Sequence, residues 1–399
     1  MTKLKLCGAA MLLSMLAFAP AIADETGDLD GEPLLVTSGD PNHPRYANAG
    51  DNLRNGVVSL FIEFDGIPVG GFLCTAAVID ERHILTAAHC VREAGDTVKR
   101  LRVVLSAGLA APAILDATAF SVHPDFDFSS PIFGAFADGD VAVVELPNPL
   151  PGFIERYDLY TTADEFGETT RHYGHGRSGR GNKGATGGSD FFFARTGLNM
   201  YEATLGDFGF PSDQLLHDFD SGGEKHNAMD WWFSGFFCGP DNPNPPQAQD
   251  GKCTTFRGGN FPDRGFGKLE VGVAPGDSGG PGFIDGKIAG VHSFGFTYFC
   301  GGAGSPTNGT DFDCGLNSSW GEMSGDTRVS TFADWIDGVV TNGADTNIPE
   351  LAPAADGGAG VADIGELTDV GRAFLSVTMS RTLRTPMTFK EALAELSTD

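Results

Sequence analysis

The stretch APGDSGGPGF, residues 274–283, decides how this chain is interpreted. Its serine, Ser278, stands among glycines, which let the backbone adopt conformations that a side chain would forbid, so that N–H groups can point at a developing oxyanion. Pro281 and the apolar segment 287–294 are suited to fixing such a loop to a sheet. The stretch therefore predicts a reactive serine held in a glycine-rich loop.

A second stretch, DFDSGGEKH at residues 218–226, repeats the letters D-S-G-G around Ser221. Charged residues flank this repeat, no glycine precedes it and no proline follows it. Polar segments of this composition are common turn formers. We therefore expect Ser278 to be the nucleophile and Ser221 to be a turn residue.

A histidine with the context of a catalytic base ends the apolar run LTAAHC, residues 85–90. This residue, His89, directly precedes a cysteine, and a disulfide from that cysteine to Cys74 would pin the imidazole among small residues. A lone histidine is more often structural, and we place His83 and His123 in that class. His89 is thus the candidate general base.

An aspartate suited to orient that histidine directly precedes the apolar segment 141–146. An ionised carboxylate at the mouth of a buried strand needs a hydrogen-bond donor, because its burial is otherwise costly. The Nδ1–H of a histidine would supply one to this residue, Asp140. Asp138, two residues earlier, is interpreted as a solvated turn residue.

The rest of the sequence favours an all-β fold. The chain has 399 residues, of which 41% are hydrophobic and 56 are glycine, which suits a packed core with many tight turns. In the main body only residues 330–340 space their apolar positions at helix intervals. Residues 341–399 are predicted to form a linker and a C-terminal tail. Short β-branched and aromatic runs separated by turns occupy residues 55–90, 100–107, 113–123 and 140–150.

The N-terminus has the pattern of a secretory signal peptide. An apolar run, residues 6–23, follows Lys3 and Lys5 and ends in the small-residue sequence Ala-Ile-Ala. We expect residues 1–23 to be removed and the mature chain to be secreted or periplasmic, with no membrane association afterwards; an uncleaved anchor is the alternative. Residues 24–45 are acidic and rich in turn formers, and are interpreted as a propeptide or a loosely packed arm.

The strong negative charge of the chain makes polyanionic partners unfavourable. Its 53 acidic and 26 basic residues give a formal net charge of −27, which disfavours binding to nucleic acid and to anionic membranes.

The cysteines indicate a disulfide framework. Cys7 lies in the signal peptide, which leaves six of the seven cysteines in the mature chain. Six cysteines allow 15 connectivities. Bridges between near neighbours are the simplest assignment, and they are Cys74–Cys90, Cys238–Cys253 and Cys300–Cys314.

Several of these motifs resemble the chymotrypsin/trypsin family of serine proteases in order and in kind. They are LTAAHC, DVAVVEL, GDSGGP, HSFG and TRVSTFADWI, and the resemblance covers about residues 46–340. The order His, Asp, Ser excludes the subtilisin and α/β-hydrolase arrangements. The resemblance implies two six-stranded antiparallel β-barrels of the chymotrypsin type with a C-terminal helix, and a secreted endopeptidase activity.

The family mechanism assigns roles to the motif residues. Ser278 would attack a peptide carbonyl with His89 as general base, and Asp140 would orient His89. The N–H groups of Gly276 and Ser278 would form the oxyanion hole. This chemistry needs no metal or cofactor. The expected partner is a peptide or protein substrate, and the protein is expected to be a monomer.

The resemblance also suggests a substrate-binding surface, although the usual specificity residue is missing. The position six before Ser278, which is aspartate in the trypsin branch, is Gly272. Asp326 is predicted to reach the pocket floor and accept lysine or arginine, with a solvated or turn-capping role as the alternative. Three residues would pair with the substrate backbone as an added strand, namely Ser293, Phe294 and Gly295.

Activation also departs from the family pattern. In the family a newly formed N-terminal amine pairs with the aspartate before the reactive serine, which is Asp277 here. The usual Ile-Val-Gly-Gly start is missing, and we predict cleavage after Arg45 to expose Tyr46.

A third departure is a glycine- and aromatic-rich region at about residues 178–268, interpreted as an insertion of surface loops that restricts the cleft or binds an extended substrate. A small satellite core packed under long loops is the alternative role for its aromatic residues. Two alternatives to a protease remain open. One is a catalytically silent binding protein that uses this insertion, and the other is a secreted esterase with the same triad.

Overall fold

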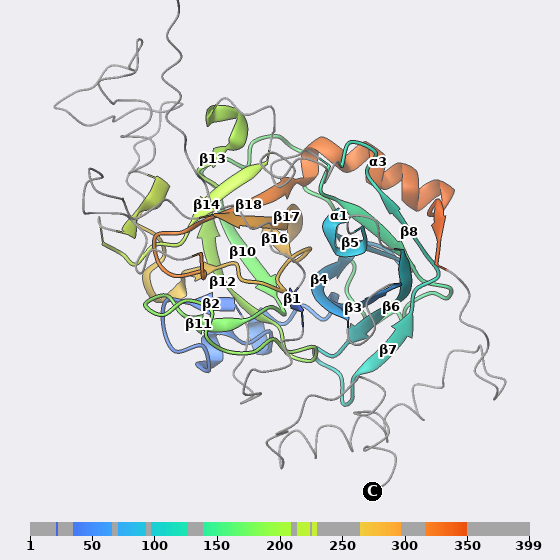
Figure 1. Cartoon of the computed structure of the whole chain (residues 1–399), viewed down its shortest axis with the longest axis horizontal. Coiled ribbons are helices and arrows are strands. Elements are labelled where there is room, and N and C mark those ends of the chain that lie inside the picture. Colours follow the sequence, from blue (N-terminus) through green and yellow to red (C-terminus); the bar gives the residue numbers. More distant parts are fainter. Residues whose placement is uncertain are drawn as a thin grey trace, which may run out of the picture.

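The described part of the chain forms two curled β-sheets side by side, with one long helix at the edge (Figure 1). The computed structural model describes residues 21–22, 35–65, 71–92, 97–126, 139–208, 214–223, 226–229, 264–296 and 316–348. The predicted all-β class with a helix near residues 330–340 is therefore confirmed.

The first sheet contains most of the strands that the sequence pattern predicts between residues 55 and 150. Its strands are β1 (Ala21–Ile22), β3 (Val57–Phe64), β4 (Phe72–Val78), β5 (His83–Thr86), β6 (Val98–Leu105), β7 (Ala113–Asp116), β8 (Ala119–Val122), β9 (Ala142–Glu145) and β19 (Thr346–Asn347). They run in the order β19-β8-β9-β5-β4-β3-β6-β7, with β1 paired to β4. This is three strands more than the six predicted for each barrel, and two of the nine, β1 and β19, have only two residues each.

This first sheet curls because its two ends are tied together. The N–H of Ala117, just before β8, donates to the carbonyl of Leu101 in β6 at 2.9 Å. Val, Leu, Ile and Phe side chains from both ends of the sheet then pack into one buried cluster. Burial of such side chains stabilises the fold by roughly 1.5–3 kcal/mol each.

The second sheet supplies the other half of the fold. Its strands are β10 (Thr169–Gly174), β12 (Arg195–Met200), β13 (Ala203–Thr204), β14 (Leu215–Asp218), β16 (Pro281–Ile284), β17 (Lys287–Phe296) and β18 (Met323–Arg328), in the order β12-β10-β16-β17-β18-β14-β13. The Asn199 side chain of β12 donates to the Asp218 carbonyl of β14 at 2.7 Å, which draws the two ends of this sheet together.

A small third sheet corrects the interpretation of the N-terminal arm. β2 (Leu35–Thr37) lies between β11 (Ser178–Arg180) and β15 (Val271–Gly272). All three residues of β2 are fully buried. The interpretation of residues 24–45 as loosely packed is therefore wrong for this strand, because its apolar side chains fill space beside the second sheet.

The helix α3 (Val329–Asn342) ends where Gly343 takes a φ of 85°, a conformation that favours glycine. Val329, Phe332 and Ile336 face inward and join the core of the first sheet. Shorter helical turns are α1 (Ala88–Val91) and the 3-10 turns η1 (Pro44–Tyr46), η2 (Gly50–Asn52), η4 (Leu205–Phe208) and η6 (Gly267–Leu269). Among the described residues, no helix is long and apolar enough to cross a membrane.

The range predicted for the insertion of surface loops, residues 178–268, is too wide, because it includes strands of the second sheet. Within residues 178–268 the structure forms β11, β12, β13 and β14, of which the last three belong to the second sheet. Glycine and asparagine interrupt their hydrophobic alternation, as in RTGLNM, so the sequence pattern hides them. The cysteines at 238, 253, 300 and 314 lie outside the described residues, as do most of the signal peptide and the tail.

Candidate active site

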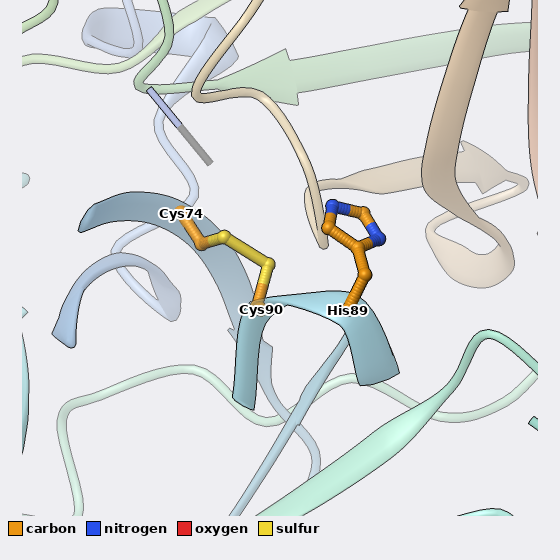
Figure 2. A group of neighbouring side chains, drawn as sticks. All are labelled: Cys74, His89 and Cys90. Carbon is orange, nitrogen blue, oxygen red and sulfur yellow. A yellow bond between two sulfur atoms is a disulfide. The ribbon is translucent and has the colours of Figure 1, made fainter. Parts of the chain in front are cut away.

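His89 is held in place by the short helix α1, which follows β5. Cys90 forms a disulfide with Cys74 of β4, with a Cα–Cα distance of 6.2 Å. Figure 2 shows that this bridge fastens one side of α1 to β4 while the imidazole extends away from it. The predicted Cys74–Cys90 bridge is confirmed, and it fixes the position of the adjacent histidine.

Asp140 contacts His89 twice. Its Oδ2 lies 2.7 Å from the His89 Nδ1, and its Oδ1 accepts a hydrogen bond from the His89 backbone N–H at 2.9 Å. Burial by itself would raise the pKa of Asp140, but the charge of His89 and the hydrogen bonds from His89 and Ser293 outweigh it, so the pKa lies below its ordinary value. The carboxylate is thus held in its charged form behind the imidazole.

Ser293 also holds this carboxylate. The sequence pattern names Ser293 only as a residue that pairs with substrate and does not predict its contact with Asp140. The pairing of β17 with β18 shifts register between His292 and Phe294, so Ser293 is the extra residue of a β-bulge. Its hydroxyl donates to Asp140 Oδ2 at 2.5 Å. Thr327 of β18 donates to the Asp140 backbone carbonyl at 2.8 Å. Asp140 therefore lies just before β9 of the first sheet, but side chains of the second sheet hold it in place.

The Ser293→Ala variant is expected to lower kcat by about 10- to 100-fold, because a hydrogen bond to a charged group is worth about 1.5–3 kcal/mol. Steady-state kinetics on a peptide substrate would measure this. Ser121→Ala removes a hydroxyl that bonds Asp345 at 3.0 Å and is the matched control. Equal kcat values for the two variants would contradict the role of Ser293.

Ser278 lies in a loop that both sheets hold. Its carbonyl accepts a hydrogen bond from the N–H of Thr75 in β4 at 2.8 Å, and the Thr75 hydroxyl donates to the Gly276 carbonyl at 3.0 Å. Gly279 has a φ of 80°, and a Cβ there would lie 2.0 Å from the Thr86 hydroxyl. Glycine is therefore required for the close approach of this loop to the first sheet.

The amide groups predicted to bind the oxyanion are available. In the described part of the chain, the N–H groups of Gly276 and Ser278 donate no hydrogen bond. Gly276 has a φ of 96°, and a Cβ there would lie 2.8 Å from the Gly176 Cα. The loop thus combines a left-handed glycine with two amides that have no protein acceptor.

His89 and Ser278 are both buried, and their reactive atoms have no protein partner. Within the described ranges neither His89 Nε2 nor Ser278 Oγ has a hydrogen-bond partner, and the two do not bond to each other. Their residues are 3% and 0% exposed, respectively. The structure therefore joins Asp140 to His89 directly and leaves the serine hydroxyl and the imidazole without competing partners.

Asp277 is fully buried and takes backbone partners in this uncleaved chain. Its Oδ1 accepts from the Gly176 N–H at 2.7 Å and its Oδ2 from the Ala274 N–H at 2.8 Å. Burial raises the pKa of Asp277 to about 7, against the effect of these hydrogen bonds and of the charge of His292.

Tyr46 lies elsewhere, packed with Leu35 and Val271, and its hydroxyl bonds Gly39 and Lys268. Cleavage after Arg45 stays a prediction.

The segment 293–295 lies in β17 and pairs with β18 on one side. Gly295 pairs with Ser324 of β18, and the Phe294 side chain is 2% exposed. On the other side of β17, the pairing with β16 ends at Val291. The pairing of residues 293–295 with a substrate backbone stays a prediction.

Gly272 faces an aromatic ring. It pairs with Val36 of β2, and a Cβ built on it would lie 2.7 Å from the Phe219 ring. The Phe219 ring belongs to a buried cluster with Val36 and Ala274. Glycine at this position therefore allows the ring to pack against the backbone.

A Gly272→Asp variant is therefore not expected to gain activity on lysine or arginine substrates. The added side chain would collide with Phe219 and lower the free energy of unfolding by about 1–3 kcal/mol, as overpacking does. Denaturant unfolding and a substrate panel would measure both effects. Gly152→Asp is the control, because nothing lies within 4 Å of a Cβ there. A gain of basic specificity at unchanged stability would contradict this account.

Asp326 does not lie on a substrate-facing surface. It is 0% exposed, and its carboxylate accepts a hydrogen bond from the Tyr201 hydroxyl at 2.5 Å and contacts His292 Nδ1 at 2.9 Å. The prediction that Asp326 reaches a pocket floor is corrected: its position in β18 directs it into the interior of the second sheet.

Ser221 lies in a polar turn, as the residues around it predict. Its Oγ accepts from the Gly223 N–H at 3.3 Å and lies 2.8 Å from the His226 Nδ1. Neither contact involves His89 or Asp140.

Comparisons with known proteins agree with the sequence motifs. Residues 53–189 match the family model described as Trypsin, a range that includes His89 and Asp140 and ends before Ser278. No curated protein matches the chain in a sequence search. One similar solved structure is neuropsin, described as a serine protease expressed in the limbic system of mouse brain. It is 13% identical, with a TM-score of 0.45, and the match covers 74% of this chain and 98% of that chain. The present chain thus contains a trypsin-family domain, which the family match places over residues 53–189.

Proposed function

We propose that this chain is an exported serine endopeptidase that hydrolyses peptide bonds with His89, Asp140 and Ser278. One arrangement carries the proposal. Asp140 holds the Nδ1 side of the buried His89 imidazole at 2.7 Å, while His89 Nε2 and Ser278 Oγ have no partner among the described residues. The match to the trypsin family supports a peptide or protein as the substrate.

In the proposed acylation, Ser278 Oγ attacks the carbonyl carbon while His89 Nε2 takes the hydroxyl proton. Asp140 fixes the tautomer of His89 and stabilises the imidazolium that forms. The N–H groups of Gly276 and Ser278 donate to the oxyanion of the tetrahedral intermediate, each contributing about 3 kcal/mol. Collapse of this intermediate breaks the C–N bond, and His89 gives its proton to the leaving amine.

Deacylation repeats these steps with water. After the amine product departs, the acyl part of the substrate remains as an ester on Ser278. His89 then removes a proton from the water that attacks the ester carbonyl. When this second tetrahedral intermediate collapses, the Ser278 oxygen leaves and takes the proton back from His89. The carboxylic acid product departs and the free enzyme is restored.

Export is part of the proposal. The signal-like residues 1–23 would direct the chain out of the cytoplasm, to the periplasm or the medium. The Cys74–Cys90 disulfide beside the catalytic histidine supports an oxidising compartment, where such bridges persist.

Labelling with a fluorophosphonate, read by intact mass, tests the proposal on the full chain as its host secretes it. One adduct is expected on the wild type and on Ser221→Ala, and none on Ser278→Ala, because only an activated serine with an ordered oxyanion site reacts readily. The same mass gives the mature N-terminus. An unlabelled wild type, or an adduct that persists in Ser278→Ala, would refute the assignment.

A further inference from the structure

The interior of the second sheet holds four polar side chains that the proposed mechanism does not use. We call them the histidine cluster: His172 of β10, His217 of β14, His292 of β17 and Asp326 of β18. Each residue is at most 1% exposed. Interior positions of a small barrel are normally filled by apolar side chains, so three imidazoles around one carboxylate require a physical reason.

Asp326 is the centre of the histidine cluster. Its Oδ1 lies 2.9 Å from His292 Nδ1 and 3.6 Å from His217 Nε2, and its Oδ2 lies 3.9 Å from His172 Nδ1. One ligand atom each from His172, His292 and Asp326 lie within 4.8 Å of one another. Nitrogen and oxygen ligands about 2.0–2.1 Å from a tetrahedral zinc ion are about 3.3 Å apart. The observed separations bracket that value.

Several ring nitrogens in the cluster have no partner. Among the described residues, His172 Nδ1 and His217 Nδ1 make no hydrogen bond, and His217 Nε2 lies 3.6 Å from Asp326 Oδ1, beyond the usual length of a hydrogen bond. Buried polar groups without partners destabilise a fold. A proton shared by His292 and Asp326 would explain only the 2.9 Å contact. A cation between the rings would engage His172 and His217 as well.

Other side chains orient the cluster from behind. The Thr170 hydroxyl lies 2.6 Å from His172 Nε2, and the Tyr201 hydroxyl donates to Asp326 Oδ2 at 2.5 Å. When His172 donates from Nε2 to Thr170, its Nδ1 lone pair is turned toward the Asp326 carboxylate. Hydrogen bonds of this kind to the outer atoms of histidine and carboxylate ligands are typical of metal sites.

We propose that the histidine cluster is a structural metal site for a zinc ion, with His172, His292 and Asp326 as ligands and His217 beside them as the fourth. Imidazole nitrogen and carboxylate oxygen are ligands that zinc accepts, and four protein ligands are typical of structural zinc sites. The other group with metal-ligand chemistry in the described ranges, Cys74, His89 and Cys90, is not available because its cysteines form the disulfide in Figure 2.

The site would tie the strands of the second sheet together behind the nucleophile. The His292 N–H donates to the Gly280 carbonyl at 2.9 Å, and the Gly279 N–H donates to the His292 carbonyl at 2.8 Å. Gly279 and Gly280 directly follow Ser278. A bound ion would therefore brace the segment that carries the reactive serine without touching substrate.

Metal content of the untagged full chain, produced in medium with and without added zinc chloride, tests the proposal. Elemental analysis by mass spectrometry is expected to give about one zinc per wild-type chain, and far less in Asp326→Asn and His172→Asn. The zinc-loaded protein is expected to unfold about 5–10 °C above the zinc-depleted protein. Cobalt-loaded wild type is expected to show the visible absorption of a tetrahedral ion, and this absorption should be lost in both variants.

The matched control is His83→Gln, which removes another buried histidine that pairs with an aspartate, Asp80 at 2.7 Å, in the first sheet. It is expected to keep its zinc. Wild type without zinc after zinc-supplemented growth, or zinc retained in full by both cluster variants, would overturn the proposal. The wild-type stoichiometry decides the question even if a cluster variant does not fold, and because none of these readouts is catalytic, they are independent of the proposed protease activity.

Discussion

The His89→Ala variant is expected to lower kcat by about 10⁶-fold, and the double variant His89→Ala/Ser278→Ala to lower it no further. Without the imidazole, the Ser278 hydroxyl keeps its proton and the leaving amine receives none, so the two residues fail as a unit. Residual catalysis would come from the free amides of Gly276 and Ser278 and from substrate binding. Kinetics of the wild type, both single variants and the double variant would measure this coupling.

His83→Gln is the control for this experiment, because its buried imidazole contacts Asp80 at 2.7 Å and no residue of the site. It is expected to keep nearly full kcat. Losses that add across the double variant, or an equal loss in His83→Gln, would show that His89 does not act together with Ser278.

The Asp140→Asn variant is expected to lower kcat by about 10⁴-fold with little change in KM. The His89 backbone N–H needs an acceptor at Oδ1, so the asparagine carbonyl would occupy that side and its amide NH₂ would face His89 Nδ1. That amide donates instead of accepting, so the imidazole would carry its proton on Nε2. The face turned toward Ser278 would then be unable to take the hydroxyl proton.

Steady-state kinetics, with denaturant unfolding to show that the variant is folded, would measure this effect. Asp80→Asn changes the matched aspartate beside His83 and is expected to be nearly neutral for kcat. A loss below 10-fold in folded Asp140→Asn, or a loss that appears mainly in KM, would contradict the orienting role of Asp140.

Residues whose partners are near in sequence, or whose motif carries its own chemistry, could be predicted from the sequence. The Cys74–Cys90 bridge closes a separation of 16 residues, and the helix α3 follows from its apolar spacing. The flanking residues of His89, Asp140 and Ser278 predict their roles, and the structure brings the first two within hydrogen-bonding distance. Gly276 and Gly279, on either side of Ser278, have positive φ values, which favour glycine.

The predictions that the structure corrects concern residues whose contacts come from strands far away in the sequence. Asp326 directly precedes the motif TRVSTFADWI, but its contacts are to Tyr201 and His292, and the register of β18 turns it inward. The buried strand β2 was hidden in an acidic, turn-rich segment because its partners β11 and β15 are remote in sequence. Strands such as β12 lack strong hydrophobic alternation, so their pairing depends on neighbours that a local pattern does not contain.

The sequence by itself determined the all-β class and the local bridge beside His89, and it predicts Ser278 and not Ser221 as the nucleophile, because each of these inferences depends on residues a few positions apart. Only the tertiary structure decided that Ser293 holds Asp140 across 153 positions, that Thr75 holds Gly276 across 201, and that three histidines surround Asp326. The physical reason is that strand register and curl set which side chains meet. Both are fixed by the packing of the whole sheet and not by any one segment.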